Sequence, residues 1–152
     1  MTTTPGSGTT PQRPLVLVGG ASGALGQAIA ERIAADGTDL VLTYRTNGDA
    51  AQALAARLQP DGAIAPLRMD VTDAASVEAT ARAVQALGRR LDAVVFAAGA
   101  HIAQPRVADV GDAEWRAVVE TEQFGFANVA RSFIPLFRAQ KGGAFVCVTT
   151  FA

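Results

Sequence analysis

From about residue 14 onward, short apolar runs alternate with segments in which apolar side chains recur every three or four residues. The runs at 14–19, 39–44, 63–69, 91–96 and 143–148 predict strands, and the segments between them predict helices at 24–35, 49–58, 73–87 and about 112–138. Strand–helix–strand units require parallel strands joined by right-handed crossovers. The pattern therefore predicts an α/β fold built on a doubly wound parallel sheet.

Local signals place some of the element ends. Asp73 is an expected N-cap, and Gly88 is expected to stop the helix that follows it. Pro135 is expected to bend or end the long fourth helix. Trp115 and Phe126 are expected in the core or between helices.

Composition limits the class of protein. The chain has 152 residues, which suits one domain over 14–152, and the polar segment 1–13 is expected to be a disordered tail. A net charge of −1 argues against a nucleic-acid partner or an anionic membrane surface. No apolar run reaches the roughly 18 residues of a membrane helix.

The residues that can oxidise or bind metals are few. The lone Cys147, expected to be buried in the fifth strand, cannot form a disulfide within the chain, which favours a reducing, cytoplasmic compartment. The single histidine has no partner histidine, cysteine or carboxylate cluster in the sequence pattern, so no metal site is predicted.

A glycine-rich turn joins the first strand to the first helix. Gly20, Gly23 and Gly26 recur every three residues at this junction. Such a turn needs one glycine to reverse direction, one to let a pyrophosphate approach the backbone, and one for close helix–strand packing. The helix start then offers free N–H groups to the phosphates. The position of the motif predicts a dinucleotide site in a Rossmann fold, and the alternative is a tight turn that binds nothing.

The end of the second strand indicates which dinucleotide is bound. A carboxylate about twenty residues after the glycine turn would accept hydrogen bonds from a free ribose 2′-hydroxyl. The sequence instead reads Thr43-Tyr44-Arg45-Thr46. A guanidinium at Arg45 suits a 2′-phosphate by charge and by its forked geometry, so NADP(H) is favoured over NAD(H). The alternative is that Arg45 is a solvated surface charge.

Three motifs together resemble the short-chain dehydrogenase/reductase family. Residues 19–26 (GGASGALG) look like its glycine signature, Asp70-Val71-Thr72-Asp73 is similar to its segment after the third strand, and Ala97-Ala98-Gly99 resembles its Asn-Asn-Ala-Gly stretch. The resemblance covers 14–152 and implies the N-terminal cofactor-binding portion of that fold, incomplete on its C-terminal side. It also implies a homo-oligomer formed through the long helix.

The resemblance assigns roles to individual residues. It implies that Asp70 and Val71 contact the adenine and that Ala98 and Gly99 lie along the cofactor. The pyrophosphate would be held by the residues of the glycine turn, namely Gly20, Ser22, Gly23, Leu25 and Gly26.

The chain also departs from the family pattern, which marks it as an atypical member. Gly19 replaces the usual threonine, and Ala24 replaces a signature glycine. The position of the family's catalytic asparagine holds Glu122, and that of its catalytic serine holds Thr150. The family's Tyr-x-x-x-Lys pair would lie beyond residue 152. The only tyrosine here is Tyr44, and the only lysine is Lys141, so these 152 residues alone are expected to be inactive.

Two further residues carry open alternatives. Glu122 lies on or beside the apolar stripe of the fourth helix, where it is either a replacement proton-relay or substrate-contact residue or an ordinary carboxylate at the edge of the stripe. His101 follows the fourth strand, where ligands gather in this fold, and is either a substrate or relay residue or an ordinary loop residue.

The sequence thus predicts an NADP-dependent oxidoreductase that transfers hydride between the cofactor and a small carbonyl or alcohol substrate. Thr150 would orient the carbonyl, with Glu122 as an auxiliary catalytic group. The alternative is a catalytically impaired nucleotide-binding or regulatory protein of the same fold, which the altered asparagine and serine positions favour.

Overall fold

The computed structural model describes residues 12–59, 64–100 and 106–149. In this part of the chain, parallel strands form one sheet in the order β3-β2-β1-β4-β5. After β1 the chain moves outward through β2 and β3, then crosses back to place β4 on the other side of β1, which confirms the doubly wound α/β fold. The strands are β1 (Leu15–Gly19), β2 (Asp39–Tyr44), β3 (Leu67–Arg68), β4 (Ala93–Phe96) and β5 (Ala144–Cys147).

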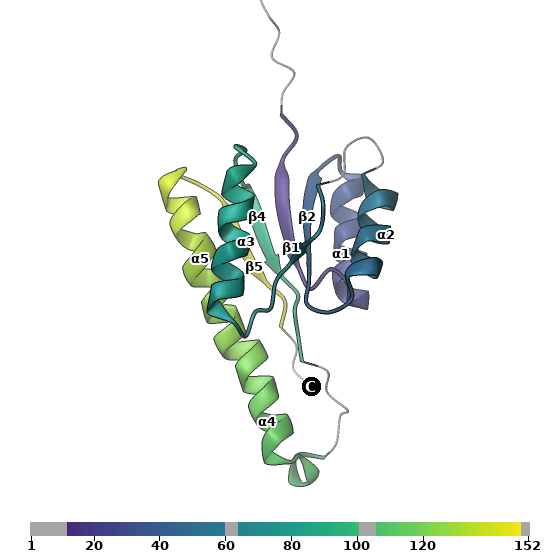
Figure 1. Ribbon diagram of the computed structural model, residues 1–152, viewed down its shortest axis with the longest axis vertical. Coiled ribbons are helices and arrows are strands. Elements are labelled where there is room, and N and C mark those ends of the chain that lie inside the picture. The colour runs from purple at the N-terminus through teal and green to yellow at the C-terminus, as the bar shows by residue number, and fades with distance from the viewer. Residues whose placement is uncertain (1–11, 60–63, 101–105, 150–152) are drawn as a thin grey trace, which may run out of the picture.

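Helices cover both faces of the sheet. Figure 1 shows α1 and α2 on one side of the sheet and α3 and α5 on the other, while α4 extends beyond the end where the strands finish. The α-helices are α1 (Ala24–Ala35), α2 (Gly48–Leu58), α3 (Ala74–Ala86), α4 (Asp112–Val119) and α5 (Phe126–Ala139). A short 3-10 helix, η1 (Val107–Asp109), precedes α4, and a π-helical turn, η2 (Glu120–Gly125), joins α4 to α5.

The core has two halves, one on each face of the sheet. Along β1, Leu15 and Leu17 join the cluster under α3 and α5, whereas Val16 and Val18 join the cluster under α1 and α2. This alternation follows the two-residue period of a strand, and burial on both faces explains the continuous apolar run. The sheet therefore supplies a rigid base whose carboxyl edge carries the functional loops.

Several element boundaries differ from those that the sequence predicts. The third strand is Leu67–Arg68 rather than 63–69, since these are the residues in register with β2, and residue 63 lies outside the described residues. The long fourth helix is divided by the π-helical turn, and Pro135 lies inside α5 without ending it. Asp73 does cap α3, accepting a hydrogen bond from the Ala75 N–H at 3.0 Å, and Gly88 follows with a φ of +64°.

Three side chains are less buried than expected. Cys147 is exposed because β5 is the outer strand of the described sheet and no described element covers it. Trp115 is 57% exposed, because α4 projects past the sheet and buries no residue of its own. Phe126 is 36% exposed but still makes edge-to-face contacts with Phe96 and Phe145.

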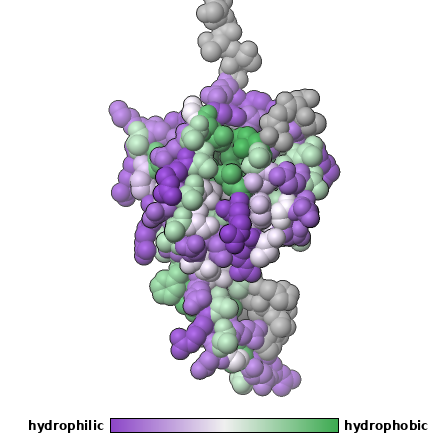
Figure 2. Space-filling view, viewed as in Figure 1, coloured by the Kyte–Doolittle hydropathy of each residue, from purple (hydrophilic) through white to green (hydrophobic). Residues whose placement is uncertain are grey.

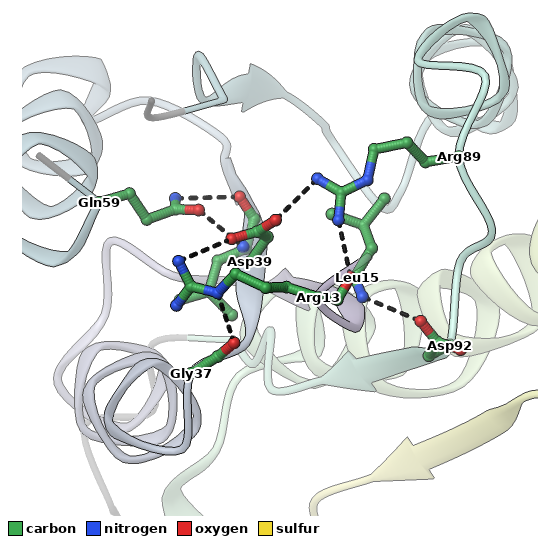
Figure 3. A network of polar contacts seen from close by, with 8 residues as sticks. Arg13, Leu15, Gly37, Asp39, Gln59, Arg89 and Asp92 are labelled. Carbon is green, nitrogen blue, oxygen red and sulfur yellow. Dashed lines mark hydrogen bonds and ion pairs between the residues drawn. The ribbon is translucent and has the colours of Figure 1, made fainter. Parts of the chain in front are cut away.

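A polar network joins the amino ends of the strands, opposite the functional edge. Asp39 at the start of β2 receives Arg13 Nη1 at 3.4 Å and Arg89 Nη1 at 2.8 Å (Figure 3). Arg13 also donates from Nε to the Gly37 carbonyl at 2.6 Å, and Arg89 donates to the Arg13 carbonyl at 2.8 Å. The Asp92 carboxylate accepts the Leu15 N–H at 2.9 Å. Two loops and two strands are thus tied to one another through charged side chains.

Replacing Asp39 with alanine is expected to lower the free energy of unfolding by about 1–3 kcal/mol. The Arg89 side chain is only 20% exposed and would lose its charged acceptor. Chemical denaturation measures the change. Glu78→Ala is the matched control, because Glu78 pairs with Arg82 at 3.7 Å on an exposed helix surface and its loss should leave the midpoint unchanged. Equal midpoints for Asp39→Ala and wild type would mean that the network adds no stability.

Candidate functional site

A cleft of about 320 Å³ lies at the carboxyl edge of the sheet, where β1, β2 and β4 end. Its position is the point where the strand order reverses, and ligands bind there in open α/β sheets. It brings together segments that are up to about a hundred residues apart in sequence. Its lining residues are Gly20, Ser22, Gly23, Ala24, Leu25, Gly26, Tyr44, Arg45, Thr46, Met69, Val71, Ala97, Ala98, Gly99, Ala100 and Thr121.

The glycines of the turn meet different steric conditions. Gly20 has a φ of +78°, and a Cβ there would lie 2.8 Å from the Ala98 Cα. A Cβ on Gly26 would lie 2.2 Å from the Gly20 carbonyl oxygen, so the close packing of α1 on the turn requires glycine. A Cβ on Gly23 would meet only that same oxygen, at 3.4 Å. Contacts within the protein therefore leave no room for a side chain at Gly20 or Gly26. At Gly23 there is room, and the missing side chain leaves the cleft open.

The start of α1 leaves its backbone donors free for an anion. Asn47 and Asp73 accept N–H groups at the starts of α2 and α3 through their side chains, whereas Gly23 at the start of α1 provides no such acceptor. The first N–H groups of a helix have no partner within the helix and carry the positive end of its dipole. Because Gly23 and the first turn of α1 line the cleft, this end suits a phosphate group.

The turn itself is held to its neighbours by backbone hydrogen bonds. The Ala21 N–H donates to the Thr43 carbonyl at 2.9 Å, and the Ala97 N–H donates to the Gly19 carbonyl at 3.1 Å. These bonds connect β1 to the ends of β2 and β4. Leu25, which follows the turn in α1, is 53% exposed at the cleft.

Positive charge gathers where β2 and β3 end. Arg45 lines the cleft, and Arg68 donates from Nε to the Arg45 carbonyl at 3.3 Å. Asp70 lies beyond the lining residues, and its Oδ1 accepts the Thr72 hydroxyl at 2.8 Å and the Thr72 N–H at 3.0 Å. Partial burial favours its neutral form, but the Thr72 hydrogen bonds together with Arg45 and Arg68 outweigh burial and hold the pKa of Asp70 below its ordinary value.

Glu122 approaches the cleft from the π-helical turn. Its Oε1 accepts the Ala100 N–H at 3.2 Å, and the side chain is exposed rather than buried in the apolar stripe. Partial burial and then the charge of Glu122 raise the pKa of the Cys147 thiol at the end of β5. Glu122 therefore contacts the loop after β4, although it is not among the residues that line the cleft.

Two of the expected site residues lie outside the described residues, and two residues that line the cleft were not expected. His101 and Thr150 fall in the ranges 101–105 and 150–152, so the structure does not place them. Thr121 and Met69 line the cleft but carry no local sequence signal. Thr121 belongs to the π-helical turn, whose extra residue per turn changes which side chains face the sheet, and sequence periodicity does not detect such an insertion.

Neither a metal-binding cluster nor a membrane span occurs among the described residues. No group of three or more histidine, cysteine or acidic side chains in this part of the chain could hold a metal ion. Across the same residues, no helix is long and apolar enough to cross a membrane.

Comparison with known proteins shows similarity to one protein family over most of the chain. Residues 14–152 match the sequence profile of the short chain dehydrogenases. An uncharacterized short-chain type dehydrogenase/reductase of Sinorhizobium fredii is 34% identical over 129 residues, covering 83% of this chain and 50% of the relative. Sulfoacetaldehyde reductase 2 of Chromohalobacter salexigens is 29% identical and is covered over 52% of its length. The chain thus spans about half the length of these curated relatives.

Solved structures show the same fold. A metagenomic short-chain oxidoreductase crystallised with NADP superposes with a TM-score of 0.80 at 26% identity, covering 91% of this chain and 63% of that one. An alcohol dehydrogenase of the archaeon Thermococcus sibiricus, complexed with 5-hydroxy-NADP, superposes with a TM-score of 0.79 at 26% identity, covering 89% of this chain and 57% of that one.

Proposed function

The chain belongs to the short-chain dehydrogenase family, and from that premise we propose that it provides the NADP-binding half of an oxidoreductase acting on a small carbonyl or alcohol substrate. The observation that carries the proposal is the cleft at the reversal of strand order, with an uncapped helix start at one wall and Arg45 at the end of β2. The relatives and solved neighbours give no support to the alternative of a regulatory, non-catalytic protein.

The residues of the cleft fit such a cofactor. Gly20, Ser22, Gly23, Leu25 and Gly26 would hold the pyrophosphate, because this turn presents backbone N–H groups and no bulky side chain. Ala98 and Gly99 would lie along the cofactor on the opposite wall. Asp70 and Val71 would contact the adenine, with the ionised Asp70 carboxylate as a hydrogen-bond acceptor.

Arg45 would select NADP(H) over NAD(H). It lies at the end of β2, where a carboxylate would be needed to accept a free 2′-hydroxyl, and Arg68 adds a second positive charge beside it. Two of the similar solved structures hold NADP or a derivative of it. A phosphate between two guanidinium groups gains charge-assisted hydrogen bonds that a hydroxyl cannot make.

The chemistry at the far end of the cleft would depend on groups near β5. Bound cofactor supplies a hydride to, or accepts one from, the substrate carbon. Thr150 would orient the substrate carbonyl with its hydroxyl. Glu122 would act as an auxiliary catalytic group, since its carboxylate accepts the Ala100 N–H after β4 and its charge acts on the Cys147 thiol of β5. These 152 residues contain no Tyr-x-x-x-Lys pair, so we expect no turnover from them alone.

The proposal extends to assembly and location. Trp115 on α4 and Phe124 on the π-helical turn are 57% and 60% exposed, which suits a homo-oligomer formed through the helical segment Asp112–Arg138. Figure 2 shows hydrophobic surface among hydrophilic side chains on the lower part of the molecule, where α4 lies. We place the protein in the cytoplasm, where its cysteine would stay reduced.

Calorimetric titration of this chain with NADP⁺ and NAD⁺ tests the function. Tighter binding of NADP⁺, by about ten- to a hundredfold, is expected, because a hydrogen-bonded 2′-phosphate adds the energy of one charged contact. Tighter binding of NAD⁺ would contradict the role of Arg45. Absence of binding by either nucleotide would contradict the proposed function itself.

A further inference from the structure

The π-helical turn Glu120–Gly125 lies where the long helix passes the cleft. A π-turn inserts one residue into the helix, which shifts the faces of the following segment by about 100° relative to the preceding one. The two sides of the turn differ in burial: α4, which projects past the sheet, buries no side chain, whereas α5 buries Val129, Phe133 and Phe137 against the sheet. The turn itself buries Thr121 and Gly125. The turn therefore changes which face of the helix is directed toward the sheet, and it does so beside the cleft.

The turn makes its first contact with the loop after β4. Glu122 Oε1 accepts the Ala100 N–H at 3.2 Å, and a Cβ on Gly99 would lie 3.1 Å from the same oxygen. The carboxylate thus packs against the backbone of two residues that line the cleft. A backbone amide in a loop has no ladder partner, so an acceptor from another element holds it in place.

The same part of the helix makes a second contact with the loop after β3. Gly125 packs so closely against Val71 that an added Cβ would lie 2.7 Å from Val71 Cγ2. Three residues further on, the Asn128 Nδ2 donates to the Val71 carbonyl at 3.0 Å. Val71 lines the cleft as well. One short helical segment is therefore attached to two separate loops of the same cleft.

We propose that the π-helical turn acts as a brace, meaning that it fixes the positions of these two loops relative to each other. Glu122 is the positioning residue for Gly99–Ala100. The proposal rests on the proposed nucleotide-binding function, and it gives Glu122 a role that does not require contact with the substrate. The important property of Glu122 is then its acceptor oxygen, and its charge is secondary. Glutamine keeps that oxygen at the same distance from the backbone, whereas alanine removes it.

The test compares Glu122→Ala and Glu122→Gln with wild type and with Glu120→Ala, an exposed acid of the same turn. Hydrogen exchange of the peptide containing Ala97–Ala100 is measured without nucleotide, and the affinity for NADP⁺ and NAD⁺ is measured by titration. We expect Glu122→Ala to speed amide hydrogen exchange at Ala100 by about fivefold or more. We also expect it to weaken the binding of both nucleotides by about fivefold. Glu122→Gln and Glu120→Ala should stay within twofold of wild type.

The possible results separate the brace from the function on which it rests. Unchanged exchange in a folded Glu122→Ala variant would overturn the brace, and so would a glutamine variant that behaves like alanine, since charge would then matter more than the acceptor. Failure of wild type to bind either nucleotide would overturn the proposed function, while the exchange measurement would still decide whether Glu122 holds the loop. Thermal melts of each variant establish that it is folded.

Discussion

Gly26→Ala is expected to destabilise the fold by at least about 3 kcal/mol, at the upper end of what overpacking costs. The new methyl group would lie 2.2 Å from the Gly20 carbonyl oxygen and 2.9 Å from the Ala21 Cα. Both neighbours are backbone atoms of a turn that is tied to β2 through the Ala21 N–H, so they cannot move aside as a side chain would. Alanine gains about 1 kcal/mol of helix propensity over glycine, which is too little to offset this clash.

Gly23→Ala is the matched control and should behave in the opposite way. Its methyl group would meet only one oxygen, at an ordinary contact distance of 3.4 Å, so the free energy of unfolding should change by less than about 1 kcal/mol. The same methyl group would enter the cleft where a phosphate must approach the backbone, and nucleotide affinity should fall at least about tenfold. Denaturant melts and nucleotide titration of both variants measure the two effects. A stable Gly26→Ala variant, or a Gly23→Ala variant with full affinity, would contradict this division of roles.

The elements that the sequence predicts well are those with a clear local cause. The first strand and first helix match closely because a continuous apolar run ends at a glycine turn and the helix follows at once. The third strand is predicted too long because an apolar run does not by itself reveal pairing, and the residues in register with β2 are Leu67 and Arg68. The fourth helix was predicted as continuous because the extra residue of a π-turn preserves the apolar spacing on each side of it.

The residues of the candidate site also divide into those that local sequence motifs predict and those that only the folded structure reveals. The glycine turn and Arg45 follow from motifs in which neighbouring residues act together, and the structure places them in one cleft. Thr121 and Met69 line this cleft through contacts between distant segments, which no local pattern records. Cys147 was expected to be buried because its strand is apolar, but burial depends on what covers the outer strand, and this is a property of the assembled sheet.

Arg45→Ala is expected to weaken NADP⁺ binding by about ten- to a hundredfold and to change NAD⁺ binding by less than about twofold. The physical reason is that the guanidinium would bind only the group that distinguishes the two nucleotides, and a hydrogen bond to a charged group contributes about 1.5–3 kcal/mol. Because the guanidinium is exposed, the wild-type preference for NADP⁺ should shrink as salt is raised, whereas the variant should show little salt dependence beyond that of NAD⁺.

The control for Arg45→Ala is Arg57→Ala, which removes the same charge from α2, where Arg57 pairs with Glu31 at 2.6 Å and does not line the cleft. It should leave both affinities unchanged, so that any loss in the Arg45 variant reflects its position and not the net charge. Calorimetric titration of wild type and both variants at two salt concentrations gives the full comparison. Retained NADP⁺ preference in Arg45→Ala would mean that Arg45 is a solvated surface charge and would leave Arg68 as the remaining described cation at that end of β2 and β3.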